Sequence, residues 1–141
     1  MNALRAMSRL LEIKRRMADA AEAEYAKVQL AVIHAQREAR SAEQTWHRLA
    51  TEKLRVKTVA DLEDHVMSVR LTRRIADAAA KEAAALEAKQ TEALQKLTEA
   101  KREVARYETW LEREEAARAA EERRLERLRE DEHASRKRKV A

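Results

Sequence analysis

A seven-residue repeat of apolar residues runs without interruption through the first 56 residues of the chain. A spacing of 3.5 residues held over so many heptads indicates a coiled coil, because the apolar seam needs a partner helix along its whole length. Many seam residues are alanine, so we expect the partner helix to approach closely. The seam positions are Leu4, Met7, Leu11, Lys14, Ala18, Ala21, Tyr25, Val28, Val32, Ala35, Ala39, Ala42, Trp46, Leu49, Lys53 and Val56.

The composition favours an essentially all-helical chain. The sequence has 141 residues, of which 40% are charged and 3% aromatic, and it contains no glycine, proline or cysteine. This bias is typical of coiled coils, and the small net charge of +5 with interleaved signs favours helix over disorder. No apolar run approaches the roughly 20 residues that cross a bilayer, and the N-terminal segment is too charged for a signal peptide. We therefore expect a cytoplasmic protein.

The repeat loses its register at "VKTVADLEDH", residues 56–65. A shift of one residue is unusual in a continuous coiled coil, which absorbs shifts of three or four. Thr58, three residues before Asp61, is a typical helix start: the hydroxyl accepts an amide hydrogen bond and the carboxylate suits the positive end of the helix dipole. The second seam is expected at Val59, Leu62, Val66, Val69, Ala76, Ala80, Ala83, Leu94, Leu97, Val104 and Leu111.

These features predict one all-α domain over residues 1–141, an antiparallel coiled-coil hairpin of two long helices. The helices are expected at about 3–56 and 59–135, with the tip at about 57–58. Trp46 should then lie opposite Val69, and Lys14 opposite Lys101. The second helix is longer, and its C-terminal overhang is charged on all sides except at Leu125 and Leu128.

No pattern in the sequence indicates catalysis. The histidines His34, His47, His65 and His133 are far apart, and the one Glu-x-x-His spacing, Glu130 to His133, lies in the charged tail without the further inward-facing carboxylates that a bundle metal site requires. There is no Gly-rich phosphate loop, and a slender two-helix protein has no concave pocket. We expect no catalytic, metal or cofactor site, and no enzyme activity.

Two apolar groups allow two interpretations each. Met67, Leu71 and Ile75 follow at i, i+4 and i+8, either as part of a drifting seam or as an exposed stripe for a partner protein. Tyr107 and Trp110, with Leu111, either close the open end of the hairpin against Leu4 and Met7 or serve as a binding surface.

The basic charge of the chain also allows a nucleic-acid interpretation. The chain ends in "RKRK", and its isoelectric point is near 9.7. The overhang is nearly neutral, however, and carries no interleaved aromatic residue for base stacking. A protein partner with an acidic surface is favoured, and DNA binding is not expected.

Taken together, the hairpin, the post-turn stretch "VADLEDHVMSVRLTRRI" and the tail "WLEREEAARAAEERRLERLREDEHASRKR" resemble the FliJ/SctO (YscO-like) stalk proteins of flagellar and type III secretion export machines. The resemblance implies a coiled coil similar to the gamma subunit of rotary ATPases. It implies a stalk that regulates the hexameric export ATPase and links it to the export gate protein, at the base of a membrane-embedded secretion apparatus. Secretion chaperones are further partners that the family can bind.

The resemblance also implies two partner-binding surfaces. The gate-facing positions correspond to Met67, Leu71 and Arg74, although Arg74 stands where the family has a small or apolar residue. The ATPase-facing end corresponds to Arg5, Arg9, Arg123, Arg124 and Arg127. The alternatives are a generic structural or adaptor coiled coil, and a basic helical nucleic-acid binder.

Overall fold

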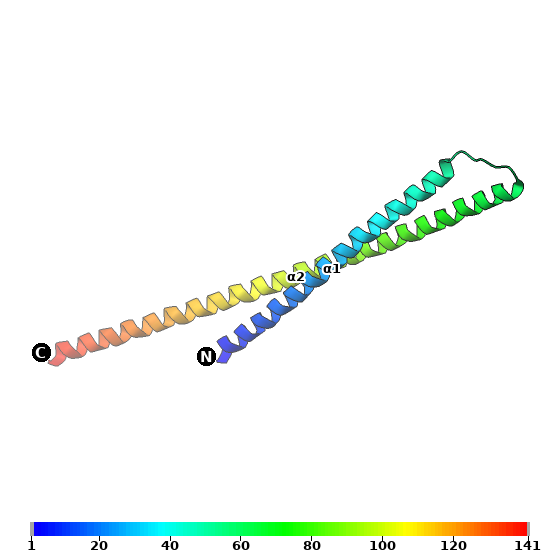
Figure 1. The fold of residues 1–141 in the computed structure, drawn as a ribbon. Helices are drawn as coiled ribbons and strands as arrows, with labels where there is room; N and C mark the ends of the chain where they lie inside the picture. Colours follow the sequence, from blue (N-terminus) through cyan, green and yellow to red (C-terminus); the bar gives the residue numbers. More distant parts are fainter. Residues whose placement is uncertain (1, 141) are drawn as a thin grey trace. The chain divides into compact units, whose positions relative to one another are not determined.

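Two long helices make up the described part of the chain, residues 2–140 (Figure 1). In the computed structural model, α1 spans Asn2–Thr51 and α2 spans Val59–Val140, and residues 52–58 connect them. No strand occurs among these residues. The chain is therefore an all-α antiparallel coiled-coil hairpin with a longer second helix, as the heptad pattern predicts.

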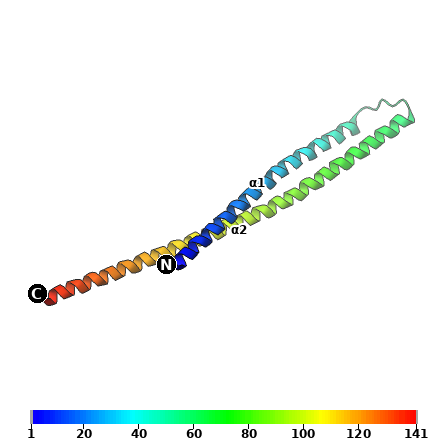
Figure 2. The ribbon, with the colours of Figure 1, turned by 60° about the horizontal axis from the view of Figure 1, so that its bottom comes forward.

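The helices pack as two compact units. The tip unit is Ala20–Thr98 and contains the connection between the helices, whereas the terminal unit combines Met1–Asp19 with Glu99–Ala141. In the terminal unit, α2 runs on past the start of α1 as the predicted overhang (Figure 2). Every residue from 119 to 140 is exposed.

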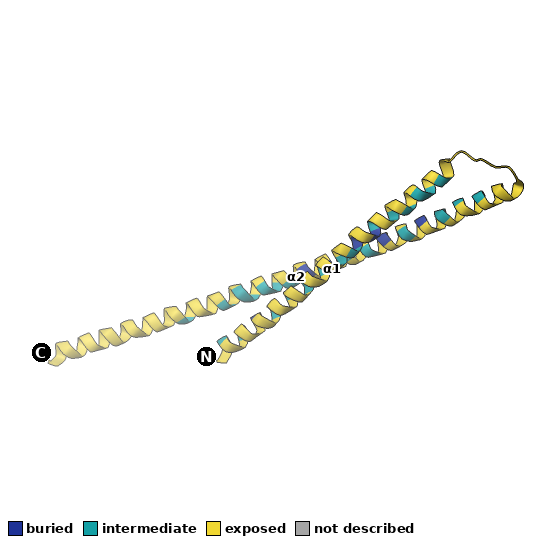
Figure 3. Ribbon diagram, in the orientation of Figure 1, coloured by how far each residue is buried: buried dark blue, intermediate teal, exposed yellow. Residues whose placement is uncertain are grey.

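The seam of α1 is the one that the sequence predicts. Each seam position from Leu4 to Leu49 is buried or half-buried, with Leu11, Val32 and Ala35 the most enclosed (Figure 3). The last two predicted positions, Lys53 and Val56, lie in the connection and are exposed. Large apolar residues on one face of α1 thus gain the burial that stabilises the packed helix.

The seam of α2 is rich in alanine, and in its middle part it differs from the prediction at two places. Ala79 faces inward instead of Ala80, and Ala93 instead of Leu94, which is 46% exposed. In a run of alanines the apolar contrast that fixes the heptad phase is missing, and the larger Leu94 suggested the wrong phase. The enclosed positions of α2 are Val69, Thr72, Ala76, Ala79, Ala83, Leu86, Gln90, Ala93, Leu97, Ala100, Val104, Tyr107 and Leu111.

The start of α2 is capped as predicted. The backbone N–H of Asp61 donates to Thr58 Oγ1 at 3.2 Å, and the Asp61 carboxylate accepts from the backbone N–H of Lys57 at 3.3 Å. α1, however, ends at Thr51 and not near residue 56, and α2 continues to Val140 and not only to about 135. The tip is therefore the whole of residues 52–58.

Because the tip is longer than predicted, the first turns of α2 have no partner helix beside them. The first turns of α2 extend beyond the end of α1 (Figures 1 and 2), so the predicted seam residues Val59, Leu62 and Val66 are exposed. They were assigned inward on the assumption that α1 continues to residue 56. Because α1 stops earlier, only the connection lies beside them.

The pairing of the helices is displaced by about one helical turn along α2 for the same reason. Trp46 stacks on Arg73, whose guanidinium carbon lies 4.4 Å from the centre of the indole ring, one turn beyond the predicted Val69. Lys14 pairs with Glu103 at 3.5 Å and does not face Lys101. The displacement thus replaces a predicted lysine–lysine mismatch with an ion pair.

Candidate protein-interaction surfaces

An exposed apolar stripe lies on α2 shortly after the tip. Met67 is 69% exposed, Leu71 is 58% exposed, and Ile75 continues the stripe one turn further on. The inward positions at this level are Val69, Thr72 and Ala76, so the stripe is outside the seam. Of the two interpretations that the sequence allows, the exposed one holds.

The stripe leads into a groove between the helices of the tip unit. Ile75 and Thr72 line this groove from α2, and Ser41, Ala42 and Thr45 line it from α1. A partner protein that binds along the stripe could therefore place an apolar side chain in this groove as well as cover the exposed helix surface. This combination is typical of sites where one protein receives the side chains of another.

Arg73 fixes the helix beneath the stripe. Its guanidinium donates to both Glu43 oxygens, at 3.0 and 2.8 Å, and to Asp77 Oδ1 at 2.8 Å, while it stacks on Trp46. The hydrogen bond from Arg73 lowers the pKa of the Glu43 carboxyl below its ordinary value, and the same bond raises the pKa of Arg73. Met67 and Leu71 are thus presented by a helix that this cross-helix network holds in place.

The predicted gate-facing set is arranged as follows. Met67, Leu71 and Arg74 are all exposed and all belong to the tip unit. Arg74 is adjacent in sequence to Arg73, but none of the salt bridges among residues 2–140 involves it. Its charge is therefore available at the edge of the stripe.

The predicted ATPase-facing arginines belong to the terminal unit, and all five are exposed. Arg124 pairs with Glu121 at 2.7 Å, which lowers the pKa of the Glu121 carboxyl. Arg123 Nε donates to the carbonyl of Ala119 at 3.3 Å. Arg5 and Arg9 lie on α1, and the other three arginines lie on α2.

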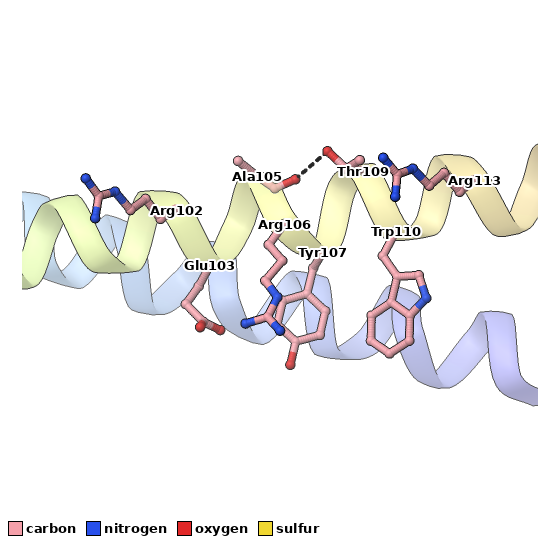
Figure 4. Close-up of a pocket in the computed structure, with 8 residues that line it drawn as sticks. All are labelled: Arg102, Glu103, Ala105, Arg106, Tyr107, Thr109, Trp110 and Arg113. Atoms are coloured by element: carbon pink, nitrogen blue, oxygen red, sulfur yellow. Dashed lines mark hydrogen bonds between the residues drawn. The ribbon is translucent and has the colours of Figure 1, made fainter.

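A third surface surrounds Trp110. We call it the Trp110 groove; it lies along α2 in the terminal unit and is lined by Arg102, Glu103, Arg106, Tyr107, Trp110 and Arg113, among others (Figure 4). The rings of Tyr107 and Trp110 are 6.1 Å apart between centroids, and Trp110 is 53% exposed.

Of the three residues in the expected end-closing cluster, Tyr107 and Leu111 are half-buried, whereas Trp110 is exposed. The sequence contains one indication that Trp110 is exposed. Trp110 directly precedes the seam residue Leu111, and the heptad period itself places that position on the flank.

The described residues show neither a metal centre nor a membrane span. No group of three or more histidine, aspartate or glutamate side chains among residues 2–140 is placed to hold a metal ion. In the same range, neither helix has a stretch long and apolar enough to cross a membrane.

Comparison with known proteins assigns no family. No family model, no curated protein and no solved structure matches the chain. The function is therefore inferred from the surfaces themselves.

Proposed function

We propose that the chain is a non-enzymatic central-stalk protein of a type III export apparatus, which binds and regulates the hexameric export ATPase and links it to the membrane export gate. The observation that carries this proposal is the apolar stripe of Met67 and Leu71, exposed directly after the tip of a two-helix hairpin. The stalk family that the sequence resembles has its gate-facing surface at this place. The protein would act in the cytoplasm at the base of the secretion apparatus, where secretion chaperones are further candidate partners.

Burial of the stripe by a partner would release further free energy. Burial of a methionine or leucine side chain contributes about 1.5–3 kcal/mol. Met67 and Leu71 keep more than half of their surface in water, so most of that free energy is available to a partner. A gate protein that buries both side chains would gain specific affinity without disturbing the hairpin seam.

The charge pattern of the overhang is compatible with weak, reversible contacts to a partner that changes position relative to it. Its arginines and glutamates are exposed and alternate in sign, and Arg123 and Arg127 take part in no salt bridge among the described residues. Exposed ion pairs are each worth about 0–1 kcal/mol and are screened by salt. Many weak contacts of this kind would keep the overhang inside an ATPase ring without binding it tightly at any one position.

The first experiment measures ATP hydrolysis by the export ATPase of the same organism with and without the full chain. We expect binding and a change in the hydrolysis rate, and a weaker effect for the triple variant Arg123→Glu, Arg124→Glu, Arg127→Glu. The matched control is Arg37→Glu, an exposed arginine on α1 in the tip unit. Neither binding nor a change in hydrolysis with the wild-type chain would refute the stalk proposal.

The second experiment tests the stripe. The double variant Met67→Asp, Leu71→Asp should lose binding to the cytoplasmic domain of the export gate protein, with a change in unfolding free energy within about 0.5 kcal/mol. Leu30→Asp is the control, because Leu30 is also 69% exposed but lies on α1. If the double variant unfolds much more easily, the stripe belongs to the core; if it still binds, the gate contact lies elsewhere.

A further inference from the structure

We infer that the Trp110 groove binds an acidic peptide segment of a partner protein, one that carries an apolar side chain between its carboxylates. This inference is independent of the stalk proposal, since the groove residues belong neither to the apolar stripe of Met67 and Leu71 nor to the predicted ATPase-facing arginines. It begins from an unequal distribution of charge around the groove.

The one carboxylate in the lining of the groove, and a second one close to it in sequence, pair with basic residues of α1. Glu103 pairs with Lys14 at 3.5 Å, and Glu108 pairs with Arg15 at 3.2 Å. By contrast, none of the salt bridges among residues 2–140 involves the groove residues Arg102, Arg106 or Arg113. The groove therefore presents three guanidinium groups to solvent, and guanidinium binds carboxylate in a planar, bidentate manner.

The two aromatic rings of the groove also differ: Tyr107 is engaged by α1, and Trp110 is largely free. Lys14 Nζ lies 5.8 Å from the centre of the half-buried Tyr107 ring, so one face of Tyr107 is occupied. Trp110 is 53% exposed, which leaves much of the indole free to receive an apolar side chain. Exposed tryptophan and arginine are the residue types that most often dominate binding energy at protein interfaces.

The spacing of the arginines fits a short peptide. Arg106 lies about 6 Å along the helix axis from Arg102, and Arg113 about 10.5 Å beyond Arg106, at 1.5 Å per residue. An extended segment of about five residues covers this length at about 3.3 Å per residue. In Figure 4, Arg106 and Trp110 project to one side of α2, and Arg102 and Arg113 to the other. A segment lying along the groove would thus meet guanidinium groups on both edges.

Two other occupants fit less well. A single-stranded nucleic acid needs aromatic rings that stack successive bases, but Tyr107 is half-buried with Lys14 over its ring, which leaves Trp110 as the exposed ring of the groove. A second copy of the chain, related by two-fold symmetry through the groove, would place arginine against arginine. Separate carboxylates around one apolar side chain match both the guanidinium groups and the indole.

The test uses the full chain and a fluorescein-labelled peptide of glutamates with two leucines at its centre. Fluorescence anisotropy should show binding that weakens as salt is raised. Arg106→Glu and Trp110→Ala should each lower the affinity about tenfold or more, because a hydrogen bond to a charged group is worth about 1.5–3 kcal/mol. Arg37→Glu makes the same change in net charge outside the groove and should alter the affinity less than about twofold.

Three results would overturn the inference. An equal loss with Arg37→Glu would mean that only net charge attracts the peptide. Binding of single-stranded oligonucleotide that depends on Trp110, without binding of the peptide, would make the groove a nucleic-acid site. Self-association of the chain that Trp110→Ala abolishes would make the occupant a second copy. Circular dichroism of each variant confirms that the helices are retained.

Discussion

Replacement of Leu97 by alanine should destabilise the protein far more than the same replacement at Leu94. The two leucines are less than one turn apart on α2, yet Leu97 is 7% exposed and Leu94 is 46% exposed. They therefore provide a matched pair in which residue type and helix are the same and only the heptad position differs.

The magnitudes follow from this difference in exposure. Leucine-to-alanine changes in cores cost about 2–5 kcal/mol, of which the upper part arises from unrelaxed cavities. A two-helix seam is open to water at its edges and relaxes, so we expect about 2–3 kcal/mol for Leu97→Ala. At Leu94 roughly half of the surface is already in water and no cavity forms, which gives about 0.5–1 kcal/mol.

Urea denaturation followed by circular dichroism measures both values. With a slope of about 1–3 kcal/mol per molar urea, Leu97→Ala should lower the midpoint by about 1 M or more, and Leu94→Ala by much less. An equal slope for the three proteins shows that the denatured states are comparable. If Leu94→Ala costs as much as Leu97→Ala, the heptad phase through Ala93 and Leu97 is wrong.

Three further changes test other parts of the fold. Ala76→Leu, at a position only 1% exposed, should cost about 1–3 kcal/mol by overpacking, whereas Ala80→Leu on the exposed face should change the unfolding free energy by less than about 0.5 kcal/mol in the same urea assay. Thr58→Ala removes the cap of α2 and should cost about 0.5–2 kcal/mol, with faster amide exchange confined to the first turn. Because the pKa of Glu43 is held below 4.5 in the folded state, its ion pair stabilises the fold above that pH and is lost as the pH falls through the folded value. Glu43→Gln should therefore show a smaller fall in melting temperature on acidification, and identical pH profiles would show that the pair contributes nothing.

The seam of α1 could be predicted because its inward residues contrast with their neighbours. Tyr25, Val32 and Trp46 are large residues that recur at heptad spacing, and the phase they define can be followed from Leu4 to Leu49. The cap at Thr58 was equally predictable, because it depends on local chemistry. On α2 the runs of alanine on both sides of the seam leave the phase open, and only the packed partner decides between Ala93 and Leu94.

The end of α1 could not be predicted from local preference either. Residues 52–56 are compatible with helix, and Lys53 and Val56 continue the heptad period. A hairpin needs a segment that reverses the chain, and because the sequence has no glycine or proline to mark that segment, local preference leaves its position open. In the structure α1 ends at Thr51, and the first turns of α2 are exposed.

The phase of the seam also determines which large apolar residues are left over for partners. Once Ala76, Ala93 and Leu97 face inward, Met67 and Trp110 have no place in the seam, although a strictly structural hairpin would gain solubility from polar residues there. The two surfaces lie in different units, so we expect their effects to be independent. Substitution of Met67 and Leu71 by aspartate should leave acidic-peptide binding at the Trp110 groove unchanged, and Trp110→Ala should leave binding to the gate protein unchanged. If either change abolished both gate-protein binding and acidic-peptide binding, the stripe and the Trp110 groove would be parts of a single binding surface.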